Sequence, residues 1–507
     1  MVGYATRWFL LIFPVFFASG AWAQTPSSHV EPAASREARR SPVTRLSQRL
    51  FGAIPLSTKS EDARKSLELA WDKYENAMYD PAADLARQAA KKDPQSALSF
   101  AMVSFAARRG MPDAAALAQA KALLPHATAD EQLVVRWMTD IQDHNLLPAI
   151  ASMNDLLKRY PHDKHVLYVT GEWLFLQQDD DRARTLLETA LQVDPNFPAA
   201  LNRLGYLYLD SSNPDPAKAV ASLKRYAEVE PSSPNPQDSL GEVLREAGED
   251  QGSIEHYQAA LKIDSAYISS QYGLGNVRTL MGDFAGARHE YDRAIPMAEN
   301  PMDELYVKYL KTFVYFWEGR PEEGRAAFTA LAKEAASKKE PNSQFQIGLA
   351  QALLAADAPS EVEQLKSLSV FLAHRLPGMS ESDRGIARAA VMRERVRVAA
   401  LQGQSKDAEQ AVSDLEALAT ASRDQLMQSY FDSARGYLLA SKGDYENAAE
   451  ALSADQHSPL VLQQLAAVQE KLGHAAEAQA ARTCLKYHRS SEAEWFLATH
   501  NGTAQSN

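Results

Sequence analysis

Apolar residues along most of this chain recur at steps of three and four, the spacing that places side chains on one face of an α-helix. Ala183, Leu187 and Ala190 follow this spacing, and the same spacing recurs after Ala287. The runs are short, and turn residues separate them. Alternation of Val or Ile with polar residues is scarce, and it predicts no credible sheet. The pattern therefore predicts an all-α protein built from short helices.

A glycine interrupts the middle of one of these predicted helices. In "LNRLGYLYL", residues 201–209, Gly205 costs roughly 1 kcal/mol relative to alanine, so the absence of a side chain should serve a purpose. Equivalent glycines recur at intervals of 34, 36 and 34 residues, at Gly171, Gly205, Gly241 and Gly275. A two-residue insertion in the loop "DSSNPDP" accounts for the longer interval. Each unit is predicted to be two short helices, with small residues that let the second helix approach the first at the glycine.

This repeat resembles the tetratricopeptide repeat (TPR), which combines a Leu-Gly pair, a tyrosine, a second helix with spaced small residues and a closing proline. The matching residues, in order, are Leu201, Leu204, Gly205, Tyr208, Ala219, Leu223 and Pro231. The Leu-Gly pair recurs at 240–241 and at 274–275. The resemblance implies an α-solenoid, a right-handed superhelix of stacked antiparallel helix pairs of about 34 residues each.

A second marker extends the repeats toward both ends of the chain. It is a turn glycine followed five residues later by a small residue, and each such glycine should end a helix in the left-handed conformation. These glycines are Gly110, Gly248, Gly282, Gly319, Gly403, Gly443 and Gly473. We count about a dozen units between residues 62 and 490, stacked as one elongated solenoid. Residues 61–340 hold the N-terminal and central repeats, 341–490 hold divergent TPR-like repeats, and 491–507 form a C-terminal tail.

The first 23 residues are typical of an export signal. Arg7 precedes an apolar run from Trp8 to Ala18, and Ala21-Trp22-Ala23 is a small-x-small cleavage site. We expect cleavage between Ala23 and Gln24 and a periplasmic or secreted mature protein. The apolar run is shorter than the roughly 20 residues of a membrane span, although an uncleaved anchor is the alternative.

Residues 24–60 form a linker rich in Pro, Ser and Arg. Ser41 and Pro42 favour the start of a short amphipathic helix, on which Val43, Leu46 and Leu50 share a face. Such a helix would touch a membrane surface or a partner, or it would cover the exposed core of the first repeat. Any membrane contact is expected through this N-terminal part of the chain alone.

Charge and candidate chemistry narrow the function. The 53 basic and 65 acidic residues give a net charge of −12, which argues against a nucleic-acid partner. The sequence has no HExxH, GxSxG or Walker motif, so we expect no enzyme, no metal and no cofactor. His162 and His165 lack a complete ligand set. Cys484 is the only cysteine, and we expect it to be a small buried residue without a disulfide.

The TPR resemblance implies a groove that binds a segment of another protein. First helices line the concave side of such an array, and their side chains off the packing face are the candidates for partner contact. On this chain the candidates are Tyr168, Phe175, Asn202, Arg203, Tyr206, Arg245, Tyr272, Asn276, Tyr309, Phe313 and Phe316. Each aromatic could instead pack between neighbouring helices. If Tyr206 lines the groove, Tyr206→Ala should weaken partner binding and leave stability nearly unchanged.

An arginine-rich stretch, residues 381–403, is a second candidate surface. Arg384, Arg388 and Arg395 stand on one side of the predicted helix, and Arg393 and Arg397 form another pair. An acidic partner or an anionic envelope polymer could bind there, although solvated arginines paired with glutamates explain the pattern better. We therefore expect an exported TPR scaffold that assembles proteins in the bacterial cell envelope. The alternative is an accessory factor for secretion that holds a polysaccharide or a translocating chain. The sequence sets neither the identity of the partner nor the oligomeric state.

Overall fold

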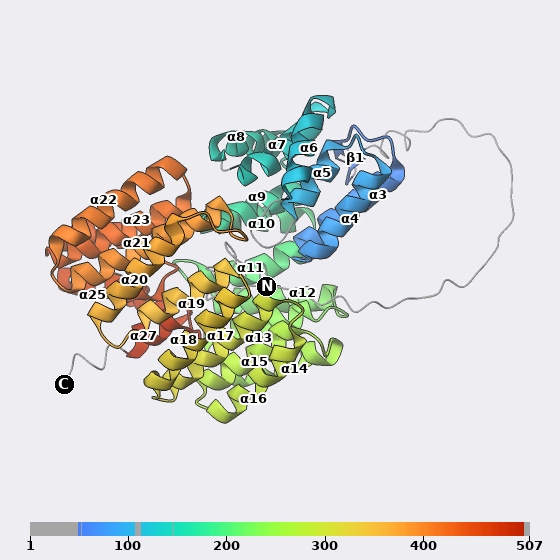
Figure 1. The fold of residues 1–507 in the computed structure, drawn as a ribbon. Helices are drawn as coiled ribbons and strands as arrows, with labels where there is room; N and C mark the ends of the chain where they lie inside the picture. The colour runs from blue at the N-terminus through green and yellow to red at the C-terminus, as the bar shows by residue number, and fades with distance from the viewer. Residues whose placement is uncertain (1–48, 52, 107–112, 144, 501–507) are drawn as a thin grey trace, which may run out of the picture. The chain divides into compact units, whose positions relative to one another are not determined.

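The computed structural model describes residues 49–51, 53–106, 113–143 and 145–500 (Figure 1). Within these residues, consecutive helices pack in twelve pairs, from α3/α4 to α25/α26, and α27 follows them. The only strands there are the two short ones of a hairpin. The prediction of an all-α array of paired helices is confirmed. The described chain divides after residue 163 into two compact units, each held together by contacts among its own residues.

The first unit contains the hairpin and three helix pairs. Its elements are β1 (Arg49–Leu50), β2 (Ile54–Pro55), α3 (Glu61–Glu75), α4 (Tyr79–Lys92), α5 (Ala97–Phe105), α6 (Ala114–Leu123), the 3-10 helix η2 (Leu124–His126), α7 (Ala129–Gln142) and α8 (Leu146–Arg159).

The hairpin differs from the amphipathic helix predicted for this region. Leu50, expected on a helical face, lies in β1 and pairs with Ile54 of β2, and both side chains are buried. The backbone N–H of Phe51 donates to Glu68 of α3 at 3.0 Å, and the Thr128 hydroxyl donates to the Pro55 carbonyl at 2.6 Å. The hairpin thus covers the apolar end of this unit. Hydrogen bonds to Glu68 of α3 and to Thr128, which precedes α7, hold its backbone there.

Several N-terminal predictions fall outside the described residues. These are the signal at 1–23, its cleavage site, the linker through residue 48 with Ser41, Pro42, Val43 and Leu46, and the turn glycine Gly110. Over the part of the chain that is described, no helix combines the length and the apolar character needed to cross a membrane.

The second unit contains the nine remaining pairs and α27. Its elements are α9 (Lys164–Leu176), α10 (Asp180–Val193), α11 (Pro198–Asp210), α12 (Pro216–Val229), α13 (Asn235–Ala247), α14 (Asp250–Ile263), α15 (Ile268–Leu280), α16 (Phe284–Ala294), the 3-10 helix η3 (Ile295–Met297), α17 (Pro301–Trp317), α18 (Pro321–Ser337), α19 (Pro341–Leu353), α20 (Ala358–Ala373), α21 (Glu381–Leu401), α22 (Ser405–Ser422), α23 (Gln425–Ser441), α24 (Tyr445–Leu452), α25 (Pro459–Leu472), α26 (Ala475–Lys486) and α27 (Ala493–His500).

The turn glycines of this unit have the predicted conformation. Each glycine follows the first helix of a pair. Its φ lies between +69° and +83°, a backbone region that residues with a Cβ rarely adopt. These are Gly248, Gly282, Gly319, Gly403, Gly443 and Gly473. The regular reversal of the chain at these positions explains why the pairs continue through the divergent C-terminal half.

The repeat glycines permit close packing of the second helix, with one correction to the expected contact. A Cβ built at Gly205 would lie 2.5 Å from Cγ of Leu223, and one at Gly275 would lie 2.6 Å from the ring of Tyr291. The space beside each glycine is thus filled by a large side chain of the second helix, Leu223 or Tyr291. The small residue expected there lies one turn earlier on that helix. The glycine makes room for that large side chain, which is why both recur with the same period.

Replacing Gly205 with leucine should destabilise the second unit by roughly 1 to 3 kcal/mol, because the new side chain overlaps Leu223. Thermal melting of the full chain measures this loss. Gly252→Ala is the matched control, since a Cβ there meets one flexible leucine methyl at 3.3 Å. An unchanged melting temperature for Gly205→Leu would show that α11 and α12 do not approach this closely.

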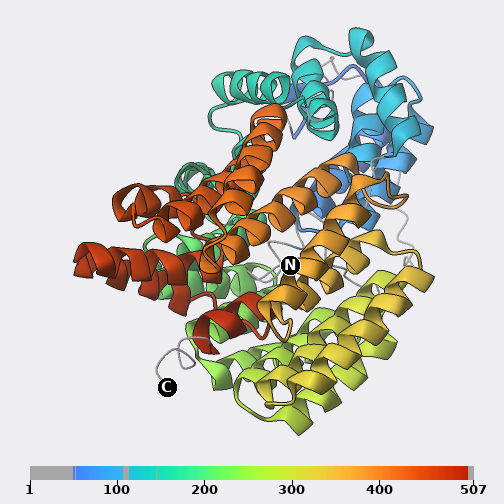
Figure 2. The ribbon, with the colours of Figure 1, turned by 60° about the vertical axis from the view of Figure 1, so that its left-hand side comes forward.

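The two ends of the second unit contact each other, which a single open solenoid would not allow. Gln177, after α9, accepts a hydrogen bond from the backbone N–H of Gln425 at 3.2 Å. His457 lies 3.0 Å from the carboxylate of Asp180, and the Cys484 thiol lies 3.3 Å from the carbonyl oxygen of Ser212. In Figure 2 the red C-terminal helices of this unit accordingly lie beside green ones. Cys484 is buried and free of a disulfide, as predicted.

Candidate functional site

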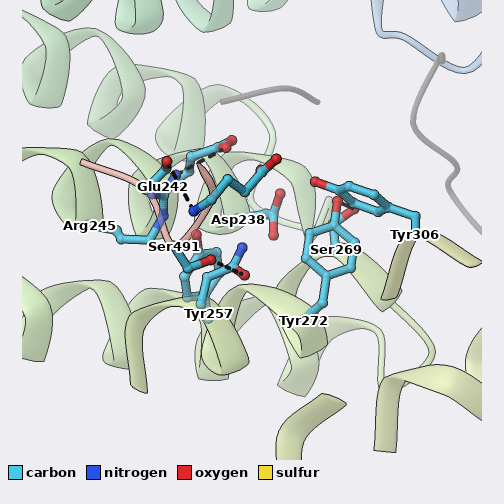
Figure 3. A pocket seen from close by; sticks show the side chains of 11 residues that line it. Asp238, Glu242, Arg245, Tyr257, Ser269, Tyr272, Tyr306 and Ser491 are labelled. Carbon is cyan, nitrogen blue, oxygen red and sulfur yellow. Dashed lines mark hydrogen bonds and ion pairs between the residues drawn. The ribbon is translucent and has the colours of Figure 1, made fainter. Parts of the chain in front are cut away.

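The last described residues lie against the first helices of the central pairs. Residues 489–500, here called the C-terminal segment, consist of a short loop and α27; the sequence predicted a tail here. The loop borders a pocket whose other walls come from α13, α14, α15 and α17 (Figure 3). The walls include Asp238, Glu242 and Arg245 of α13, Tyr272 and Asn276 of α15, and Tyr306 of α17. We call the surface of α13, α15 and α17 that faces the segment, with the adjoining Asp250, the groove.

Arg489 holds one end of the segment. Its guanidinium donates two hydrogen bonds to the Asp250 carboxylate, one of 3.0 Å, and a third to the carbonyl oxygen of Arg245 at 3.0 Å. Arg245 in turn donates to the carbonyl oxygen of Arg489. The site lies at the C-terminal end of α13, where the exposed carbonyls and the helix dipole favour a cation. The corner between α13 and α14 is therefore built to hold an arginine.

The middle of the segment is held through both backbone and side chains. The indole Nε1 of Trp317 donates to the carbonyl oxygen of Ser491 at 2.8 Å. The Ser491 hydroxyl donates to Asn276 at 3.2 Å, and the Tyr309 hydroxyl donates to the carboxylate of Glu492 at 3.3 Å. The bond to the backbone carbonyl does not depend on side-chain identity, whereas the other two bonds select the side chains of Ser491 and Glu492.

Aromatic packing holds α27. Trp495 stacks on Trp317 of α17, with ring centroids 5.8 Å apart and an interplanar angle of 25°. Phe496 meets the same indole edge-on at 5.2 Å and the ring of Phe316 at 6.3 Å. Offset stacks and edge contacts of this kind are favourable geometries for aromatic rings. Figure 1 shows the red helix α27 beside the yellow helix α19, which it also contacts.

Several predicted groove residues meet at the C-terminal segment. Arg245, Asn276 and Tyr309 hydrogen-bond to it, Tyr272 lines the pocket beside it, and Phe316 packs against α27. The structure therefore places these five residues together beside a segment of the protein, and their binding of a partner stays a prediction. That the segment belongs to the same chain was not predicted.

The remaining predicted groove residues contact neighbouring helices. Tyr168 packs edge-on against Phe197, and Arg203 pairs with Glu172 at 2.6 Å while its guanidinium covers the ring of Phe175. Asn202 accepts a hydrogen bond from Ser239 at 2.9 Å. The described contacts of these four residues therefore serve to join successive first helices.

Tyr206 and Phe313 are core residues. Tyr206 is 2% exposed, and its hydroxyl donates to Glu242 at 3.0 Å, whereas Phe313 is fully buried against Phe328. This burial contradicts the predicted place of Tyr206 in an open groove, so we now expect Tyr206→Ala to lower stability. Tyr206 reaches from α11 to α13, between first helices of successive pairs, whereas Phe313 packs within its own pair, between α17 and α18.

The arginine-rich helix α21 does not present the predicted pair at the surface. Arg393 is 1% exposed and donates to Glu394 at 2.9 Å, to Asp455 at 3.1 Å and to Glu494 of α27 at 2.8 Å. Arg397 donates to Glu394 at 2.6 Å. The sequence predicted that these arginines pair with glutamates in solvent. The structure shows the pairing in the interior of the unit. A polymer or an acidic partner cannot reach Arg393 without opening the unit.

Carboxyl groups crowd the closed groove. Burial, and then the neighbouring Glu242, raise the pKa of Asp238 to about 7, and burial raises the pKa of Glu492 to about 7. The cavity between these walls has a volume of about 20 Å³, which is enough for about one water molecule. The occupied groove therefore has no room for a small-molecule ligand.

The melting temperature should fall as the pH rises from 5 to 8. A carboxyl with a raised pKa in the folded state holds its proton there and loses it on unfolding. Its contribution is complete below the unfolded pKa of about 4 and disappears as the pH passes about 7. Asp210, Glu361 and Asp383, whose pKa values burial also raises to about 7, act in the same direction.

The variant Glu492→Gln should show a smaller decrease between these pH values, because its amide does not titrate. The exposed Glu477→Gln is the control and should keep the full decrease. Scanning calorimetry across the range measures both. A melting temperature that rises from pH 5 to pH 8 would contradict the burial of these carboxyls.

Sequence reasoning missed the segment and its main receptors, Asp250 and Trp317. The one available signal was composition, since "RSSEAEWF", residues 489–496, combines two aromatics with both signs of charge, unlike a solvated tail. Over the residues that are described, no group of three or more His, Cys, Asp or Glu side chains could hold a metal ion.

Comparison with known proteins gives two family matches. Residues 177–236 match the family described as "Tetratricopeptide repeat", and residues 241–282 match the one described as "TPR repeat". No curated protein matches the chain. The matched ranges span α10 to α15 and include the three helices that carry the Leu-Gly pairs, α11, α13 and α15.

Solved structures with some similarity to this chain include two of MamA and one of a tetratricopeptide repeat protein. A crystal structure of MamA protein is 23% identical and covers 34% of this chain and 93% of its own, with a TM-score of 0.28. A tetratricopeptide repeat protein from Parabacteroides merdae is 14% identical and covers 54% and 94%, with a TM-score of 0.35. MamA 41-end from Desulfovibrio magneticus is 19% identical and covers 33% and 94%, with a TM-score of 0.30. TM-scores of this size do not show a shared arrangement of the helices.

Proposed function

We propose that this chain, a tetratricopeptide repeat protein, is an exported scaffold that binds a segment of another protein in its groove and so assembles proteins in the bacterial envelope. Its repeats suggest a protein–protein interaction scaffold, and proteins with such repeats are typically non-enzymatic. The observation that carries the proposal is the occupied groove, whose side chains hold a protein segment through an ion pair, a backbone hydrogen bond and aromatic contacts.

The residue types of the groove support a protein ligand. Trp, Tyr and Arg are the residues that most often carry binding energy at protein interfaces, and Arg245, Tyr309 and Trp317 all contact the segment. Location in the envelope rests on the signal-like first 23 residues. N-terminal sequencing of the exported protein should begin at Gln24, and intact chain retained in the cytoplasm would refute export.

Photo-crosslinking in an envelope extract tests the binding function. The full chain carries a photoreactive residue at Asn276 in the groove, or at Lys224 on the second helix α12 as the control. We expect a defined protein to be captured from Asn276 and not from Lys224. Retention of polysaccharide without protein at Asn276 would favour the alternative, an accessory factor for polymer secretion.

A further inference from the structure

The C-terminal segment occupies the surface that a partner would use. We infer that the groove recognises segments with an arginine, a carboxylate three residues later and a Trp-Phe pair three residues after that, and that the chain's own copy keeps the groove closed until a partner displaces it. This inference rests on the proposed function, because it names the chemistry that the same groove selects.

The spacing of the recognised groups follows from three fixed receptors. Asp250 and the end of α13 receive Arg489, Tyr309 receives Glu492, and Trp317 receives Trp495 and Phe496. Asp250 and the end of α13 belong to the α13/α14 pair, whereas Tyr309 and Trp317 both lie on α17, two pairs further along, so a ligand must place its groups at matching intervals. A charge at one end and aromatic rings at the other also fix the direction of the ligand.

The segment is suited to release. Its only helix, α27, has eight residues, and isolated helices of that length are unstable in water, so its structure depends on docking. The segment starts just after His488, whose ring nitrogens lie 2.9 Å and 3.1 Å from the carbonyl oxygens of Cys484 and Gln456. His488 therefore stays anchored to α26 while the following residues can leave.

Release leaves no bare charge in the interior. Arg393 loses Glu494 but keeps Glu394 and Asp455, and Arg245 keeps Glu246 at 2.9 Å. Buried ions that retain a partner avoid the large cost of an unpaired charge. An intramolecular ligand on a short tether acts at an effective concentration of roughly millimolar, so it blocks weak ligands and yields to strong ones.

A labelled peptide of residues 487–500 tests the inference on the full chain. In the variant Arg489→Ala, which loses the bonds to Asp250, the peptide should bind about 10- to 100-fold more tightly than to the wild type. The control Arg482→Ala, at an exposed arginine of α26 that pairs with Glu470, should match the wild type. The same peptide with alanine in place of Arg489 should bind the opened variant weakly.

Thermal melting first confirms that each variant folds, and Trp495→Ala serves as a second opened variant. The inference is overturned if neither folded variant binds the peptide more tightly than the wild type does. It is also overturned if sedimentation shows a wild-type dimer that Arg489→Ala dissociates, because the segment would then come from a second copy.

The outcomes separate this inference from the proposed function. Peptide binding to the opened variants without any protein captured from Asn276 retains the inference and refutes the function. Equal capture by wild type and Arg489→Ala, with no gain in peptide binding, refutes the inference alone.

Discussion

Arg393→Leu should destabilise the second unit by about 3 to 5 kcal/mol, the largest loss expected from a single charged residue here. The guanidinium is 1% exposed, and its removal leaves Glu394, Asp455 and Glu494 facing each other without this common cation. Their mutual repulsion in a poorly solvated site is the source of the cost. Chemical denaturation of the full chain measures it.

Two comparisons isolate this charge effect. Arg395→Leu, on the same helix but half-buried, should cost much less. Adding Asp455→Asn and Glu494→Gln to Arg393→Leu should recover part of the loss, because fewer uncompensated carboxylates remain. If the single and the triple variant are equally unstable, lost packing rather than charge explains the effect.

Tyr206→Ala should cost roughly 3 to 5 kcal/mol, the loss typical of truncating a buried aromatic ring. The side chain lies between first helices, and its removal leaves a cavity and removes the hydrogen bond to Glu242. The measurement is a denaturation curve for the full chain.

Tyr206→Phe is the matched control, since it keeps the ring and removes only the hydroxyl bond, worth about 1 kcal/mol. A stable Tyr206→Ala variant with weakened partner binding would instead restore the original assignment of this residue to an exposed groove.

The repeat could be predicted from the sequence because its signals are local. Glycine at fixed intervals reports a close helix contact, and a turn glycine reports a left-handed backbone, so Gly205 and Gly248 behave as predicted. Such signals depend on residues within one unit, which is why helix pairs were recognised in the divergent part of the chain as well, at Gly403, Gly443 and Gly473.

The groove was only partly predictable because its faces depend on distant contacts. Asn276 and Tyr309 were identified from their position on first helices, but Tyr206 occupies an equivalent position and is buried. Nothing local distinguishes these cases. The docking of Arg489 on Asp250 joins residues 239 positions apart, so no periodic pattern could reveal it.

The most direct test of the account is the position of the C-terminal segment in solution. Asn276 and Ser491 are hydrogen-bonded at 3.2 Å, so cysteines at both positions should form a disulfide within one chain under a mild oxidant. Cys484 is buried, and burial raises its thiol pKa, so it should react slowly; the two single-cysteine variants control for it. The account predicts near-complete intramolecular crosslinking, which Arg489→Ala reduces. Absence of that crosslink in the folded full chain would contradict the claim that the groove holds the segment.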